Sequence, residues 1–143
     1  MLGKSFYVIF NIMLKRNKVY LEWLKQSEYD YATAKAMFKA NRYIYVIFMC
    51  HLSLEKALKG LYVFFLNKNC PKTHDLNYLV KKIKLELPEK VELSLEILNA
   101  LSVPTRYPEE LDELLKQYSR EKTEKILKQT RQVLICLKKK LPE

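Results

Sequence analysis

Two histidines are the side chains of this 143-residue chain best suited to moving protons near neutral pH. His51 stands one helical turn before Glu55 and two turns before Lys59, so the three side chains would project from one side of a helix. In a groove, this row could bind a phosphate or a base. In a core, His51 would instead be hydrogen-bonded to Glu55 and fix how two helices pack, and its apolar neighbours favour that interpretation.

The second histidine, His74, lies in the segment PKTHDL at 71–76 and precedes Asp75 at an expected helix start. The position favours a residue of the capping turn. Its alternative role is to contact a nucleotide at the helix N-terminus, where free N–H groups attract anions.

A further candidate pair, Arg106 and Tyr107, lies in the segment TRYPEEL at 105–111, which we expect to be an irregular connection between helices. Arginine offers a planar fork for phosphate, and tyrosine offers a stacking face for a base. Arg106 could equally pair with Glu109 or Glu110 and hold the loop. No P-loop, G-x-S-x-G, carboxylate metal cluster or H-E-x-x-H motif is present, so we assign no catalytic residue, metal ligand or cofactor.

Five helical segments would position these residues. We expect helices over about 19–40, 42–67, 89–103 and 119–140, and a shorter one from Thr73 or Asp75 to about Leu87. The 42–67 segment is apolar over most of its circumference, which indicates the centre of a bundle or a subunit interface. Mostly small residues along it would allow close helix approach, namely Val46, Cys50, Ser53, Ala57, Gly60 and Phe64. The inner face of the 89–103 helix is expected to carry Leu93, Ile97, Ala100 and Leu101.

Length and composition favour one all-α domain. A chain of 143 residues can bury one continuous core, and its two glycines leave few tight turns, which disfavours a β-sandwich. We predict an antiparallel four- or five-helix up-and-down bundle over 19–143, after an apolar and basic extension at 1–18. We interpret the extension as an amphipathic segment or as a stretch upstream of a functional start at Met13. It lacks a signal-peptide cleavage site, and no stretch has the roughly 18 apolar residues of a membrane span, so we expect no membrane partner.

Charge and cysteine content bear on partners and compartment. The net charge of +10 would attract RNA, DNA or nucleotides, although a solvated lysine-rich surface is the simpler interpretation. Cys50, Cys70 and Cys136 are odd in number and lack C-x-x-C spacing, which argues against a disulfide framework and a zinc site. We therefore expect a cytoplasmic protein.

Four segments, in this order and spacing, resemble the HEPN family. They are WLKQSEYDYATAKAMF at 23–38, LSLEKALKGL at 52–61, PKTHDL at 71–76 and TRYPE at 105–109. The resemblance covers roughly residues 20–140. It implies an antiparallel four- or five-helix bundle that commonly dimerises and is often encoded beside a minimal nucleotidyltransferase as a toxin–antitoxin pair.

The resemblance also implies a test for enzymatic activity. Many HEPN members are metal-independent ribonucleases in which a histidine follows an arginine by about four to six residues, and such a histidine moves protons. Neither His51 nor His74 follows an arginine at that spacing. We therefore expect a homodimer that binds nucleotide or RNA phosphate and partners a minimal nucleotidyltransferase. The alternatives are a ribonuclease with an atypical site at His51 or Arg106, and a purely structural dimeric partner protein.

Overall fold

The computed structural model describes residues 3–106 and 111–142, and the side chains of residues 16–17 and 102–106 are not among those described. Within these residues the chain forms six helices and no strand, which confirms the all-α fold class. The helices are α1 (Gly3–Lys39), α2 (Tyr43–Leu66), α3 (Leu76–Ile83), α4 (Glu89–Arg106), α5 (Leu111–Gln117) and α6 (Arg120–Lys138).

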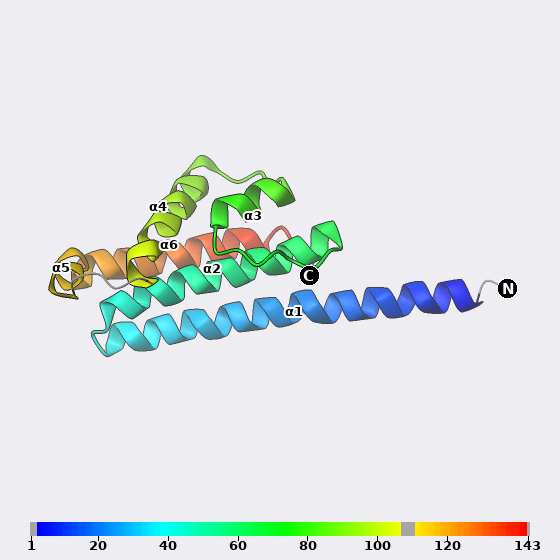
Figure 1. Cartoon of the computed structure of the whole chain (residues 1–143), viewed down its shortest axis with the longest axis horizontal. Helices are drawn as coiled ribbons and strands as arrows, with labels where there is room; N and C mark the ends of the chain where they lie inside the picture. Colours follow the sequence, from blue (N-terminus) through cyan, green and yellow to red (C-terminus); the bar gives the residue numbers. More distant parts are fainter. Residues whose placement is uncertain (1–2, 107–110, 143) are drawn as a thin grey trace.

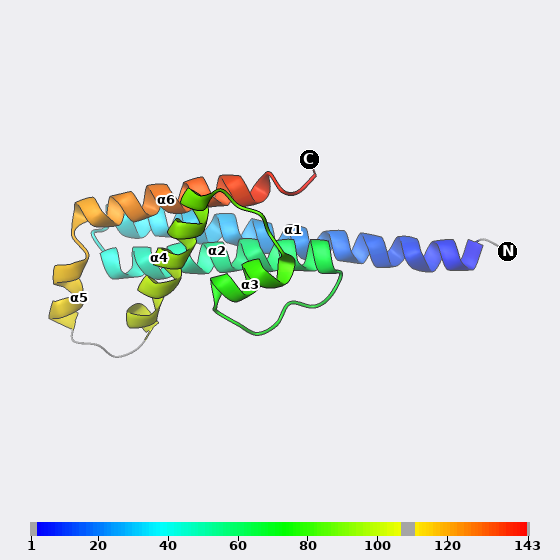
Figure 2. The ribbon, with the colours of Figure 1, turned by 90° about the horizontal axis from the view of Figure 1, so that it is seen from above.

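Helix α2 is the centre of the bundle. Helix α1 runs antiparallel beside it, α6 lies along both, and α3 and α4 pack on another side of α2 (Figures 1 and 2). Helices α2, α3, α4 and α6 all contribute leucines to the core. They include Leu54, Leu58, Leu61, Leu76, Leu79, Leu95, Leu98, Leu134 and Leu137. The central position predicted for the 42–67 segment is therefore confirmed.

Small residues let α1 and α2 approach closely. The Ser27 hydroxyl donates to the Ser53 carbonyl at 2.7 Å, and the Ser53 hydroxyl donates to the Ser27 carbonyl at 2.9 Å. Further along, a Cβ placed on Gly60 would lie 3.2 Å from the Trp23 Cβ and 3.3 Å from the Tyr20 carbonyl oxygen. The predicted strip of small residues on α2 faces α1 at these positions.

The prediction of which side of α4 faces the core is wrong. Leu93 is 56% exposed and Ile97 is 42% exposed, whereas Leu95 and Leu98 are buried. Ala100 is exposed too, and Leu101 is half-buried. The helix carries two apolar rows on different sides, and the periodicity of its sequence does not decide which row meets α2.

Several helix ends differ from expectation. Helix α1 begins at Gly3 rather than near residue 19, because no proline or further glycine interrupts residues 4–18. Helix α3 ends at Ile83 because Lys84 adopts a left-handed backbone with φ of 60°. Helix α4 passes Pro104 and ends at Arg106, although proline has no N–H to donate to the preceding turn. Helix α5 was not expected, and its 7 residues are too few for a periodic pattern.

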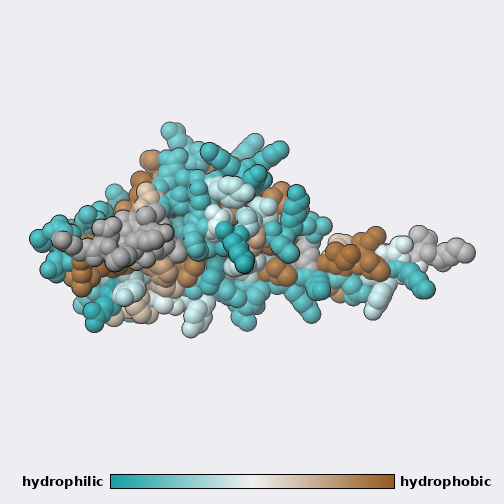
Figure 3. Space-filling model, in the orientation of Figure 1, coloured by the Kyte–Doolittle hydropathy of each residue, from teal (hydrophilic) through white to brown (hydrophobic). Residues whose placement is uncertain are grey.

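The first part of α1 extends beyond the end of α2 (Figures 1 and 2). We call residues 3–18 the arm. Hydrophobic side chains gather on it in the space-filling view (Figure 3). None of the helices in the described ranges is long and apolar enough to cross a membrane.

Candidate functional site

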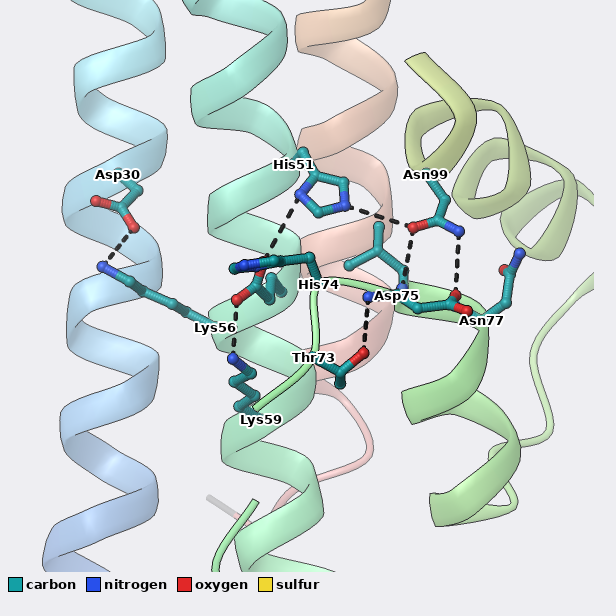
Figure 4. Close-up of polar contacts among 11 residues, drawn as sticks. Asp30, His51, Lys56, Lys59, Thr73, His74, Asp75, Asn77 and Asn99 are labelled. Atoms are coloured by element: carbon teal, nitrogen blue, oxygen red, sulfur yellow. Dashed lines mark hydrogen bonds and ion pairs between the residues drawn. The ribbon is translucent and has the colours of Figure 1, made fainter. Parts of the chain in front are cut away.

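The row predicted on α2 is present, and it is buried. His51 is 0% exposed, Glu55 3% and Lys59 8%. The Lys59 ammonium donates to Glu55 Oε1 at 2.8 Å, and His51 Nδ1 lies 3.8 Å from Glu55 Oε2 (Figure 4). Glu55 therefore lies between a cation and an imidazole on its own helix.

His74 joins this row from the α2–α3 loop, residues 67–75. Its Nδ1 lies 3.0 Å from Glu55 Oε2 (Figure 4). An ionised carboxylate only accepts hydrogen bonds, so Nδ1–H is the donor. The His74 side chain is 67% exposed, while that of Glu55 is 4% exposed. The imidazole thus covers a buried carboxylate and faces solvent on its other side.

Opposing effects act on the Glu55 carboxyl. Burial raises its pKa, but the hydrogen bonds and positive charges of Lys59 and His74 outweigh burial and hold that pKa below its usual value. Glu55 is therefore ionised at neutral pH, and its negative charge is compensated within the cluster.

Asn99 of α4 connects His51 to the start of α3, and no sequence motif predicts this role. Its Nδ2 donates to Asp75 Oδ1 at 3.1 Å, and its Oδ1 accepts from the Leu76 N–H at 3.0 Å. Because Oδ1 is an acceptor in this orientation, His51 Nε2 is the donor in their contact of 3.4 Å. The sequence offers only one signal of this role, a single amide side chain directly after the apolar Leu98.

The loop position of His74 is set by the capping turn that follows it. Asp75 is the N-cap of α3, and its Oδ1 accepts from the Asn77 N–H at 3.0 Å and the Tyr78 N–H at 3.2 Å. Thr73 Oγ1 accepts from the Asp75 N–H at 3.1 Å. The expected N-cap at Asp75 is present, and His74 lies inside this turn while its side chain contacts Glu55.

The exposed charged side chains between the end of α2 and His74 are lysines. The chain has no acidic residue between Glu55 and Asp75. Lys59 pairs with Glu55, and Lys56 pairs with Asp30 of α1 at 2.8 Å. Lys68 and Lys72, by contrast, are exposed on the loop.

A groove of about 420 Å³ lies between α1 and the end of α2, beside this loop. Its walls are Ile12, Lys15, Val19, Val63, Asn67, Lys68 and Asn69. None of the lining side chains that the structure describes is acidic. The groove thus combines an apolar floor with two ammonium groups and two amides, which suits a flat base joined to a phosphate.

Arg106 and Tyr107 are the other two predicted site residues. The Arg106 side chain and the whole of Tyr107 lie outside the described residues.

Burial raises the pKa of the Cys50 thiol to about 12, against a smaller lowering by a hydrogen bond with Thr130, so Cys50 is protonated at neutral pH. In the described part of the chain, no group of three or more histidine, cysteine, aspartate or glutamate side chains could hold a metal ion.

Comparisons with known proteins bear on the family. Residues 20–140 match the HEPN domain. The crystal structure of TT1696 from Thermus thermophilus has a TM-score of 0.73 and 21% identity, over 85% of this chain and 98% of that one. The structure of ST0689, an archaeal HEPN homologue, has a TM-score of 0.69 and 21% identity, over 85% and 96% of the two chains. No curated protein matches. At this identity the two structures show a shared fold only.

Proposed function

Because the chain belongs to the HEPN domain family, we propose that it is a homodimeric protein that binds nucleotide or RNA phosphate and partners a minimal nucleotidyltransferase in the cytoplasm. The pair would resemble a toxin–antitoxin pair. The ribonuclease spacing of arginine and histidine is absent from the sequence, so binding rather than cleavage is the leading role.

The proposal of phosphate binding rests on one observation, the groove between α1 and the α2–α3 loop. Lys15 and Lys68 both line it, together with the amides of Asn67 and Asn69. Ammonium groups attract phosphate, and amides donate hydrogen bonds to it. The net charge of +10 adds long-range attraction for a polyanion.

The test is a titration of the full chain with a labelled single-stranded oligoribonucleotide and, separately, with ATP, at low and at moderate salt. We expect saturable binding at low salt that weakens as salt rises, because phosphate contacts release counterions. Lys68→Glu should weaken binding about tenfold or more, whereas Lys128→Glu on α6 should weaken it much less. Absence of saturable binding at low salt would contradict the proposal and leave the purely structural role.

The partner is tested separately. We expect the purified chain to bind a minimal nucleotidyltransferase encoded beside its own gene, with a defined stoichiometry in isothermal titration calorimetry. If such a neighbouring gene exists and its product does not bind, the partnership is excluded and the phosphate site is untouched.

A second candidate function is metal-independent RNA cleavage, which the pairing of His74 with Glu55 favours. In its uncharged form, the exposed His74 imidazole donates Nδ1–H to the carboxylate, and its opposite ring nitrogen can take a proton from a ribose hydroxyl. His51 is 0% exposed and cannot contact a substrate directly in this structure. Any such activity should therefore be lost in His74→Ala. Unchanged RNA after incubation with the wild-type chain would exclude this candidate.

A further inference from the structure

The arm presents an unusual amount of apolar surface for a helix that leaves the bundle. Eight of its apolar side chains are between 43% and 68% exposed. They are Phe6, Tyr7, Val8, Ile9, Phe10, Ile12, Met13 and Leu14. Soluble proteins rarely leave contiguous apolar surface of this kind uncovered, so the arm has the character of a contact surface.

The charged residues of the arm are all basic, and three of its lysines share one side of the helix with Asn11. Lys4, Asn11, Lys15 and Lys18 follow one another at spacings of seven, four and three, which places them along one narrow side of the helix. No acidic residue precedes Glu22 in the sequence. A surface that covers the arm should therefore be both apolar and acidic.

The exposed face of α4 has both properties. Leu93, Ile97 and Ala100 lie on it, and Glu92 and Glu96 are exposed beside them. The chain around α4 is strongly acidic, because residues 86–113 hold half of its 16 acidic residues. They are Glu86, Glu89, Glu92, Glu96, Glu109, Glu110, Asp112 and Glu113.

The arm cannot cover α4 of its own chain. It continues the axis of α1 away from the bundle, whereas α4 crosses α2 on the opposite side from α1 (Figures 1 and 2). A second copy, however, offers the same acidic and apolar face. We propose that the arm of one copy packs on the exposed face of α4 of a second copy, and that the reverse contact closes the pair.

Reciprocal exchange closes this assembly at two copies, because each arm is covered and each α4 face is occupied. The complementary charges would steer the two surfaces together and fix their orientation. The inference rests on the homodimer of the proposed function, and it does not depend on phosphate binding.

The experiment is sedimentation equilibrium of the full chain at low salt, where charge effects are least screened. We expect the wild type to be a dimer. Lys4→Glu with Lys18→Glu should raise the dimer dissociation constant about tenfold or more, and so should Glu92→Lys with Glu96→Lys. The chain that carries all four changes should regain most of the lost affinity. Lys125→Glu with Lys128→Glu on α6 is the matched control and should leave the dimer unchanged.

The results separate this inference from the proposed function. A monomeric wild type would overturn both the homodimer and the exchanged arm. The same holds if that monomer binds anionic phospholipid vesicles through its arm. A wild-type dimer that withstands the reversals would overturn the exchanged arm alone. A dimer weakened by the arm variant but not by the α4 variant would also overturn it, because the arm would then pack elsewhere. Ile97→Ser, which changes no charge, should weaken the dimer in the same way as the reversals.

Discussion

His74 donates to Glu55 at 3.0 Å across a separation of 19 residues, and so ties a solvent-facing loop to a carboxylate inside the bundle. The same carboxylate accepts from Lys59 one turn along α2. Because one buried group receives both donors, changes at Glu55 should affect the core and the loop together.

Glu55→Gln tests the cost of removing this charge. Lys59 is 8% exposed, so its ammonium would remain largely buried without a compensating carboxylate. We expect the free energy of unfolding to fall by about 2–4 kcal/mol, as is typical when one partner of a buried ion pair is removed. Urea unfolding followed by circular dichroism measures it. Glu124→Gln removes the exposed partner of Lys128 and should change the stability by less than about 0.5 kcal/mol. A similarly small change for Glu55→Gln would contradict the buried pair.

Stability should also fall in acid through Glu55. Its pKa is lower in the folded chain than in the unfolded chain, so its contribution is complete above the ordinary glutamate pKa of about 4.3. That contribution is lost as the pH falls through the folded-state pKa. The difference in unfolding free energy between wild type and Glu55→Gln should therefore shrink between about pH 5 and pH 2. A difference that stays constant over this range would show that the folded-state pKa of Glu55 is not lowered.

Gly60→Ala tests the contact between α1 and α2. Alanine favours a helix by about 1 kcal/mol over glycine. Its Cβ, however, would lie 3.2 Å from the Trp23 Cβ and 3.3 Å from the Tyr20 carbonyl oxygen, and neither atom is the far end of a flexible side chain. We expect a net loss of about 1–2 kcal/mol, because overpacking typically costs about 1–3 kcal/mol. Lys125→Ala, exposed on α6, is the control for alanine in a helix and should be nearly neutral.

Asn99→Ala should loosen the start of α3. The change removes the acceptor of the Leu76 N–H and the donor to Asp75. We expect a loss of about 1–3 kcal/mol and faster amide hydrogen exchange at Leu76. Leu76 is the informative position, since a merely global loss of stability would speed exchange across all helices alike. Glu96→Ala, one turn earlier and exposed, should leave Leu76 protected.

Sequence patterns predicted the helices better than their contacts. The row of His51, Glu55 and Lys59 follows from helical spacing alone, and the small residues of α2 indicated close packing that Ser53 and Gly60 confirm. Helical periodicity predicts the exposed row of α4 as the buried one, because it cannot distinguish between two apolar rows on one helix. The choice between them depends on where α2 lies.

The site was predicted only in part for a similar reason. Each histidine was assigned its own local role, and no pattern indicated that His74 would meet Glu55, because the meeting depends on the path of the α2–α3 loop. Asn99 carries no motif. A single amide acquires its role only when α3 begins beside it, and this is a property of the assembled bundle.

The paired hydroxyls of Ser27 and Ser53 bear on the order in which the chain folds. They join two helices that are consecutive in the sequence and connected by a short turn at Asn41, so their encounter requires little loop-closure entropy. The α1–α2 hairpin should form in the folding transition state, whereas His74 can dock only after it. Ser53→Ala should then slow refolding, and His74→Ala should mainly speed unfolding. On a ribosome the hairpin also emerges before the α2–α3 loop, so the chain would hold its central helix in place before the segment that covers Glu55 has been made.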